Sequence, residues 1–411
     1  MYMYKKLLLS SAILCCFGAI TQAQAQDALK KALVDDSSHY INFRYRLENV
    51  DQDGFTNDAT ASTLRSTLGY KTGDISGFSG TLEFQNITQL GGDNYNDSIN
   101  GKTTHPTIAD PETTAVNQAF LTYGGFPDTS ISVGRKVFNF DNKRFVNQNN
   151  WRQHHQTFDS VSVENHSIDD TALNYVYVAN VNRSNGDDHP LGDIDSNIHL
   201  LNAQYSGWEY GSVTGYGYFL DFDNTAFSGN SSKTYGLRFT GKAPVSEGLN
   251  ALYTAEYAMQ SDHGSNTASY DADYHLLELG VGGGNWSAKL GYEVLEGNGT
   301  NRFTTPLGTG HGFHGWADRF VSVPTTGIKD KHIKLHYKVV SDDLLNGTKF
   351  DARYHDFDAK QGGADHGSEV DLKVSRSFWD HYSASVIYAD YDADSFSTDT
   401  QKAFLILGAK F

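Results

Sequence analysis

Two long polar segments of the sequence combine basic and aromatic side chains that could bind an acidic solute. They cover residues 137–156 and 296–329. Their most informative members are Arg144, Trp151, Arg152, Trp316 and Arg319. Guanidinium groups bind carboxylates through paired hydrogen bonds, and aromatic rings offer flat apolar surfaces. The combination favours contact with acidic sugars. The simpler alternative is a pair of solvent-exposed loops whose aromatic rings pack against their surroundings.

Other polar groups near these segments could carry out catalysis or bind a metal, but their spacing matches no recognised motif. Pairs of histidines are common metal ligands, and His154 and His155 lie close to Asp159 in the sequence. The residue types of a hydrolase triad occur at Ser160, His166 and Asp170, although sequence spacing does not establish a triad. We therefore expect no catalytic site, no metal site and no cofactor. Whether the acidic loops bind calcium is left open.

The segments that must position these residues alternate between apolar and polar side chains with a period of two. In the clearest example, Ile333, Leu335 and Tyr337 interleave with Lys334 and His336. Such a strand has one apolar face and one ionic face. In water the apolar face would lie in a core. In an outer membrane it would contact lipid, and the ionic face would line an aqueous lumen.

The start of the chain is typical of a secretory signal peptide. Two lysines precede an apolar stretch, and a small residue, a glutamine and Ala25 together offer a cleavage site. We therefore predict a signal peptide at 1–25 and a single domain at 26–411. Both cysteines of the chain fall inside the predicted signal peptide, so we expect no disulfide in the exported protein.

Composition narrows the class of protein further. The chain contains 24 Tyr, 24 Phe and 40 Gly, yet only 38% of its residues are hydrophobic. After the predicted signal peptide, no stretch approaches the ~20 apolar residues that a membrane-spanning helix needs. This balance fits a membrane barrel, in which only every second residue faces lipid. A formal net charge of -17 argues against nucleic acid as a partner.

About eighteen alternating segments follow one another, an even number as in bacterial outer-membrane barrels. We predict strands at 39–50, 60–71, 77–90, 115–123, 129–136, 156–164, 170–182, 195–206, 209–220, 232–241, 249–260, 270–281, 285–295, 330–340, 347–358, 367–376, 381–391 and 402–411. The connections alternate between long and short, and the last strand ends on Phe411. The pattern predicts an all-β fold, a transmembrane antiparallel up-and-down β-barrel with short periplasmic turns and long outer loops.

Alternation also assigns one face of each strand to the lumen. The basic residues that it places there are Arg44, Arg46, Arg65, Arg238, Lys289, Lys334 and Arg353. A lumen that focuses their positive charge would concentrate anions. The alternative, left open here, is that these cations pair with acidic residues of the same wall for stability. The candidate acidic partners are Glu48, Glu83, Glu256, Glu278, Glu293 and Asp371.

Several motifs give the chain a family resemblance. They include Gly134-Arg135-Lys136, Asp141-Asn142-Lys143-Arg144-Phe145-Val146, Trp151-Arg152-Gln153 and His311-Gly312-Phe313-His314-Gly315-Trp316-Ala317-Asp318-Arg319-Phe320. On these motifs the sequence resembles the alginate-export family of Gram-negative outer-membrane porins. The resemblance implies an eighteen-stranded barrel with a positively charged pore narrowed by inward loops, and it implies no cofactor. It also implies that the constriction residues are Arg135, Arg144, Arg152 and Arg319.

Together these features predict a porin of the Gram-negative outer membrane that passes hydrophilic, preferentially anionic solutes, such as acidic oligo- or polysaccharides, without converting them. The expected partners are those solutes, outer-membrane lipid and lipopolysaccharide, and the barrel assembly machinery. The alternatives are an outer-membrane enzyme that uses the histidine-bearing loops, a secreted polysaccharide-binding protein, and a structural barrel with a blocked lumen. The sequence leaves open the solute, the direction of transport, the oligomeric state and gating.

Overall fold

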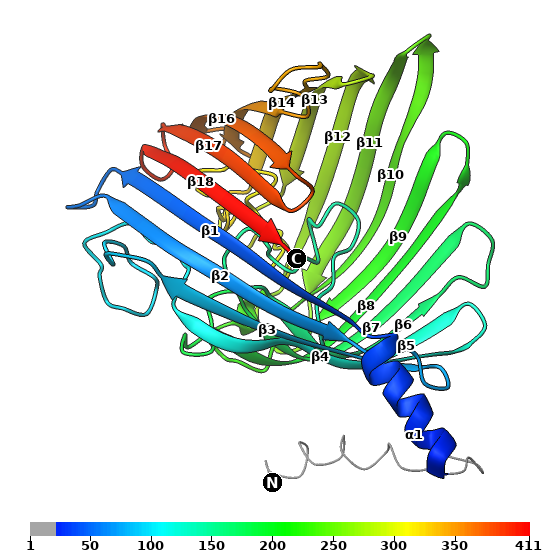
Figure 1. Cartoon of the computed structure of the whole chain (residues 1–411). Helices are drawn as coiled ribbons and strands as arrows, with labels where there is room; N and C mark the ends of the chain where they lie inside the picture. Colours follow the sequence, from blue (N-terminus) through cyan, green and yellow to red (C-terminus); the bar gives the residue numbers. More distant parts are fainter. Residues whose placement is uncertain (1–21) are drawn as a thin grey trace.

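The protein forms one closed antiparallel sheet of 18 strands in the computed structural model, which describes residues 22–411 (Figure 1). The sheet closes because β1 pairs with β2 on one side and with β18 on the other. Residues 1–21 of the predicted signal peptide lie outside the described residues. Its remainder begins α1 (Gln22–Lys30), which continues into η1 (Lys31–Asp35) below the barrel. The predicted fold class is confirmed.

Every predicted strand is present, with ends that differ by a few residues. The strands are β1 (Ser38–Gln52), β2 (Ala59–Lys71), β3 (Phe78–Gln89), β4 (Thr113–Phe126), β5 (Thr129–Lys136), β6 (Thr157–Asn165), β7 (Thr171–Asn182), β8 (Asp193–Trp208), β9 (Gly211–Leu220), β10 (Ser232–Ser246), β11 (Leu249–Asp262), β12 (Asp271–Gly283), β13 (Trp286–Leu295), β14 (Ile328–Lys338), β15 (Lys349–Ala359), β16 (Asp365–Phe378), β17 (Tyr382–Ala393) and β18 (Thr400–Lys410). A short helix, η2 (Ser228–Asn230), interrupts the connection between β9 and β10.

Connections at the end of the barrel that bears α1 are mostly tight turns, and those at the other end are mostly long. The tight turns depend on residues that tolerate a positive φ, such as Asp128 at 51° and Gly284 at 55°. One pair departs from the predicted alternation, because the turn 339–348 is longer than the outer connection 360–364. We take the end with the long connections as the outer end.

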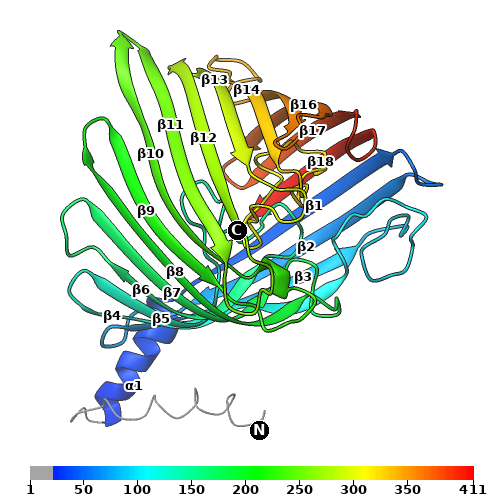
Figure 2. The same cartoon turned by 180° about the vertical axis from the view of Figure 1, so that it is seen from behind.

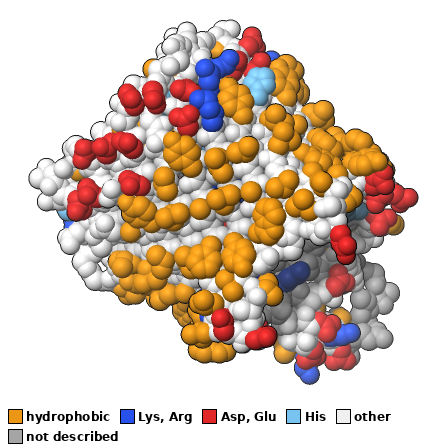
Figure 3. Space-filling model, turned by 90° about the horizontal axis from the view of Figure 1, so that it is seen from above, with side chains coloured by type: hydrophobic (Ala, Val, Ile, Leu, Met, Phe, Trp, Pro, Cys, Tyr) orange, Lys and Arg blue, Asp and Glu red, His pale blue; other side chains and the backbone are white. Residues whose placement is uncertain are grey.

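Large apolar side chains cover the outer wall. Leu237 is 59% exposed and Leu290 63%, and Figure 3 shows rows of such side chains between acidic groups at the margins. The predicted faces of β1 are confirmed, since Phe43 is 40% exposed whereas Arg46 and Glu48 are buried. Exposed rows of this kind are the surface that a barrel presents to lipid. Among residues 22–411, no helix is long and apolar enough to cross a membrane.

The inner wall is not uniformly polar, which differs from the sequence-based expectation. Strands β6 to β9 and β12 bury apolar side chains toward the barrel interior, whereas β13 to β16 and β1 present most of the buried charges. The buried apolar residues of these strands include Phe158, Val176, Val178, Ile198, Leu200, Tyr216, Tyr218, Tyr274 and Leu276. The outer connections fold back and pack on this inward apolar face, so its side chains are shielded from water.

Candidate functional site

Two outer connections, 137–156 and 296–327, fold into the barrel and contact each other. They run inside the ring of strands in both views (Figures 1 and 2). Phe145 and Phe303 join one hydrophobic cluster with the inward tyrosines of β9 and β12. The backbone amide of Asn147 donates to the carbonyl of Leu307 at 2.9 Å. The inward folding that the family resemblance implied is therefore observed.

Trp151 lies at the centre of the contact between the two connections. Its indole stacks on the imidazole of His311, with ring centroids 3.5 Å apart and planes 12° apart. The guanidinium of Arg46 lies over the same indole, 4.3 Å from its centroid. Arg46 also donates to the carbonyl of Trp151 at 2.6 Å. A wall residue, one connection and the other connection thus form a single stack.

A buried ion network surrounds this stack. Arg46 pairs with Glu48 at 2.6 Å, and Arg152 approaches the same carboxylate at 3.4 Å. Arg152 also pairs with Asp318 of the second connection at 3.1 Å, and Lys402 of β18 pairs with that carboxylate at 3.0 Å. Because both arginines have carboxylate partners, they hold the connections in place and present little free charge to a solute.

Burial and charge act in opposite directions on the carboxylates of the connections. Asp110 lies in a third connection, 90–112, between β3 and β4. Burial raises its pKa, but Arg46 and neighbouring cations outweigh burial and lower the pKa overall. The pKa of Asp318 lies well below its usual value, because Lys402 and other neighbours outweigh burial. Burial lowers the pKa of His311 to about 4, so the ring is neutral near neutral pH. The network therefore contains ionised carboxylates against guanidinium and ammonium groups.

Four more of the predicted constriction and lumen residues are also paired. Their ion pairs are Arg144 with Glu293 at 3.0 Å, Arg238 with Glu256 at 2.5 Å, Arg135 with Asp159 at 2.7 Å and Lys334 with Glu278 at 2.8 Å. Arg144 is buried and also contacts His314, with 3.1 Å between nitrogens. The alternative left open by the sequence, pairing for stability, thus describes these residues.

A second set of predicted residues has no carboxylate within ion-pairing distance anywhere in 22–411. On one side, Arg44 donates to the carbonyl of Trp151 at 3.1 Å, and Arg65 donates to the side-chain oxygen of Asn150 at 3.1 Å. Their strands place them opposite each other in register. Both therefore lie against the tip of the connection 137–156, where they donate to neutral groups and form no ion pair with an acid of residues 22–411.

The other members of this set lie on β13 and β15. Lys289 is in register with Lys334, which is in register with Arg353. The guanidinium of Arg353 lies 4.6 Å from the centre of the Trp316 ring and donates to the carbonyl of Gly312 at 3.0 Å. The row gives the lumen a basic track beside the second connection.

Arg319 lies apart from both groups. It donates to Ser397 at 2.9 Å and to the side chain of Gln52 at 3.0 Å, near the outer rim. Burial lowers its pKa from the usual value. Its hydrogen-bond partners therefore differ from those of Arg135, Arg144 and Arg152, and its role in a constriction stays a prediction.

Sequence reasoning missed how the second connection is fixed to the wall. Two buried carboxylates of β16 accept its backbone amides: Glu369 from Ala317 at 2.6 Å and Asp371 from Trp316 at 3.2 Å. Gly315 has φ +79°, and a Cβ there would lie 2.2 Å from Glu369. The spacing of Glu369 and Asp371 places both carboxylates on one face of a strand, which the sequence already indicated. Nothing in the sequence indicated which segment would pack against that face.

The catalytic and metal-binding groups considered from the sequence are not assembled. The Nδ1 of His154 lies 2.9 Å from the side-chain oxygen of Gln85, and Asp159 instead pairs with Arg135. His166 contacts Glu164 at 2.8 Å, while the hydroxyl of Ser160 donates to a backbone carbonyl. Neither group has the geometry of a metal centre or a triad.

Comparison with known proteins adds the family. A family described as alginate export matches residues 38–318 of the sequence. The chain belongs to the alginate-export family. The match covers both inward connections up to Asp318 and confirms the resemblance. No curated protein matches the chain.

Solved structures of Gram-negative outer-membrane barrels share the fold. Pseudomonas aeruginosa OpdK with vanillate superposes with a TM-score of 0.72 at 13% identity, covering 92% of this chain and 99% of that one. Pseudomonas aeruginosa OccK9 (OpdG) superposes with a TM-score of 0.73 at 16% identity, with the same coverage. Acinetobacter baumannii OccAB2 gives 0.73 at 15%, again covering 92% and 99%. This member of the alginate-export family is thus a porin-like barrel of the Gram-negative outer membrane.

Proposed function

We propose that this family member is a passive channel for hydrophilic solutes that carry carboxylates, and that it converts none of them chemically. The observation that carries the proposal is a set of basic residues that form no ion pair with a carboxylate among residues 22–411: Arg44, Arg65, Lys289 and Arg353. A low-dielectric wall focuses the field of such groups and raises the local anion concentration. The three arginines donate to neutral groups of the inward connections, such as the carbonyls of Trp151 and Gly312. A passing carboxylate would offer them stronger, charge-assisted hydrogen bonds.

The two inward connections set the size of the solute. They pack on the inner wall and on each other. We therefore place the passage between the basic strands and the tip of 137–156. This packing favours small acids and short acidic oligosaccharides as solutes over a long polysaccharide. The structure of OpdK contains vanillate, a small carboxylate, which agrees with a small solute for this barrel. The polysaccharide expected from the family name is therefore the less favoured solute.

Reversal potentials of single channels in a salt gradient test this function. The purified barrel is reconstituted in a planar bilayer, and Arg44→Gln and Arg65→Gln are compared with Lys331→Gln. Lys331 is a suitable control because it lies on the outer face and pairs with Asp356 and Asp358. We expect anion preference that falls in the first two variants and is unchanged in the control. A barrel that carries no current is the blocked-lumen alternative and would overturn the proposal.

A further inference from the structure

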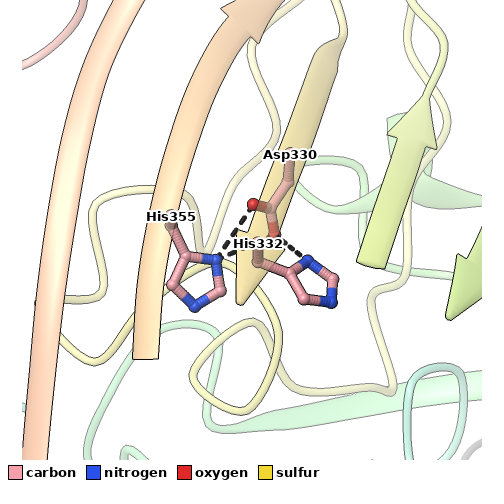
Figure 4. Close-up of side chains that lie close together, drawn as sticks. All are labelled: Asp330, His332 and His355. Atoms are coloured by element: carbon pink, nitrogen blue, oxygen red, sulfur yellow. Dashed lines mark hydrogen bonds and ion pairs between the residues drawn. The ribbon is translucent and has the colours of Figure 1, made fainter. Parts of the chain in front are cut away.

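Asp330, His332 and His355 form a buried group on the inner wall that the channel proposal does not use. Asp330 and His332 lie two residues apart on β14, and His355 faces His332 in register from β15 (Figure 4). The Nδ1 atoms of both rings point to the Asp330 carboxylate, at 3.2 Å from His332 and 3.0 Å from His355. The exposed fractions of the three residues are 0%, 3% and 0%.

Asp330 has no lysine or arginine partner within the part of the chain that the structure describes; its ion-pairing neighbours are the two histidines. The adjacent acids differ, because Glu293 pairs with Arg144 and Glu278 pairs with Lys334. A carboxylate that is fully buried without a compensating cation is costly. A positive charge close to the Asp330 carboxylate would therefore stabilise the group.

The far nitrogens of both rings face carboxylates, which is the arrangement that orients metal-binding histidines. The Nε2 of His332 lies 3.2 Å from Glu278, and the Nε2 of His355 lies 3.9 Å from Asp371. Neither the Nε2 of His355 nor the facing oxygen of Asp371 has a hydrogen-bond partner among the described residues. When an imidazole binds a metal through one nitrogen, its other N–H donates to such an acceptor.

The spacing of the ligand atoms suits a small ion. In a tetrahedral zinc site with bonds of about 2.0–2.2 Å, neighbouring ligand atoms are roughly 3.3–3.6 Å apart. The ligand atoms of Asp330, His332 and His355 all lie within 4.8 Å of one another, and Asp330 belongs to a second such group with Glu293 and His314. A small movement of the rings thus gives three ligands, and the Glu293 carboxylate also lies within 4.8 Å of Asp330.

We propose that Asp330, His332 and His355 bind one divalent transition-metal ion of the zinc class. Imidazole and carboxylate ligands suit zinc, whereas magnesium and calcium prefer oxygen ligands alone. The ion ties β14 to β15 where the buried carboxylates of β16 hold the second inward connection. The site is structural, because all three side chains are closed to solvent.

Zinc content of the folded barrel tests the site. The protein is stripped with a chelator, exchanged into metal-free buffer, incubated with zinc chloride and desalted before elemental analysis. We expect one zinc per wild-type chain, loss of that zinc in His332→Gln and His355→Gln, and affinity about 10–100-fold weaker in Glu278→Gln, which removes an orienting acceptor. Wild-type protein that retains no zinc would overturn the proposal.

His336→Gln is the matched control. His336 lies on the same strand and contacts Asp351 of β15 at 2.8 Å, but it belongs to no three-ligand group in residues 22–411. Zinc content should be unchanged in this variant, and equal loss in His336→Gln and His355→Gln would overturn the assignment. If the ligand variants do not fold, the visible absorption spectrum of wild-type protein loaded with cobalt tests the site instead. Bands typical of tetrahedral nitrogen and oxygen ligation would support the site, and their absence would refute it.

Discussion

The imidazole of His311 lies flat on the indole of Trp151, with 3.5 Å between ring centroids. These residues belong to the two inward connections, and their contact is the point at which the connections are coupled. Arg46 covers the other side of the indole at 4.3 Å from its centroid. The width of the passage should therefore depend on this stack.

Trp151→Ala is expected to increase single-channel conductance. Removal of the indole takes away the surface on which both His311 and Arg46 rest, so the tip of 137–156 loses its contact with the second connection. Trp208→Ala is the control, because Trp208 is 49% exposed on the outer wall. Unchanged conductance in Trp151→Ala would show that the stack does not limit the passage.

Arg144→Met is expected to destabilise the barrel by about 3–5 kcal/mol, because it leaves Glu293 buried without its guanidinium partner and with only His314 and Tyr274 beside it. The midpoint of urea unfolding in lipid or detergent measures the effect. The double variant Arg144→Met with Glu293→Gln should recover much of the loss, since the uncompensated charge is then removed. Equal stability of the single and double variants would contradict the pairing.

Acid should weaken the attachment of the connection 137–156. Burial lowers the pKa of His154 to about 4 from the ordinary 6.5, and the charges around it are Asp187, Arg135, Arg65 and Asp110. The folded state binds the proton less readily than the unfolded state does. Stability is therefore complete above about pH 6.5 and falls as the pH decreases toward about 4, by roughly 1–3 kcal/mol.

Urea midpoints at several pH values measure this loss of stability. His154→Gln keeps a polar partner for Gln85 but cannot titrate, so its stability should depend less on pH than that of the wild type. The same pH dependence in both proteins would assign the effect to other groups.

Gly291→Ala should impair folding. A Cβ at Gly291 would lie 1.9 Å from the Nε2 of His332, so the ring would have to move away from Glu278. Overpacking of this kind costs about 1–3 kcal/mol. Gly215→Ala provides the comparison, because a Cβ there would meet nothing within 4 Å. The fraction of heat-modifiable folded barrel on gels is the readout, and equal fractions for the two variants would contradict the crowding at His332.

The sequence predicted the strands well because lipid and lumen impose opposite chemistry on successive residues. β5 has the predicted bounds, Thr129–Lys136, and β8 extends the prediction 195–206 only at its ends. Alternation failed on the inner face of β8, where Ile198 and Leu200 are apolar. A strand sequence cannot show that a distant connection will cover its inward face.

The sequence predicted which basic residues belong to the candidate site, but not which acidic residues they pair with. Arg46 and Glu48 alternate on one strand, so their contact was within reach of the sequence. The contacts of Arg144 with Glu293 and of Arg152 with Asp318 depend on how two connections far apart in the chain fold inward. Only the structure separates these paired cations from the unpaired Arg44 and Arg65.

The reversal potential of the wild-type channel in asymmetric potassium chloride tests the central claim most directly. If the unpaired cations of β1, β2, β13 and β15 govern the passage, chloride carries most of the current, and the sign of the potential reports anion preference. A potential of the opposite sign, showing that potassium carries the current, would contradict the account.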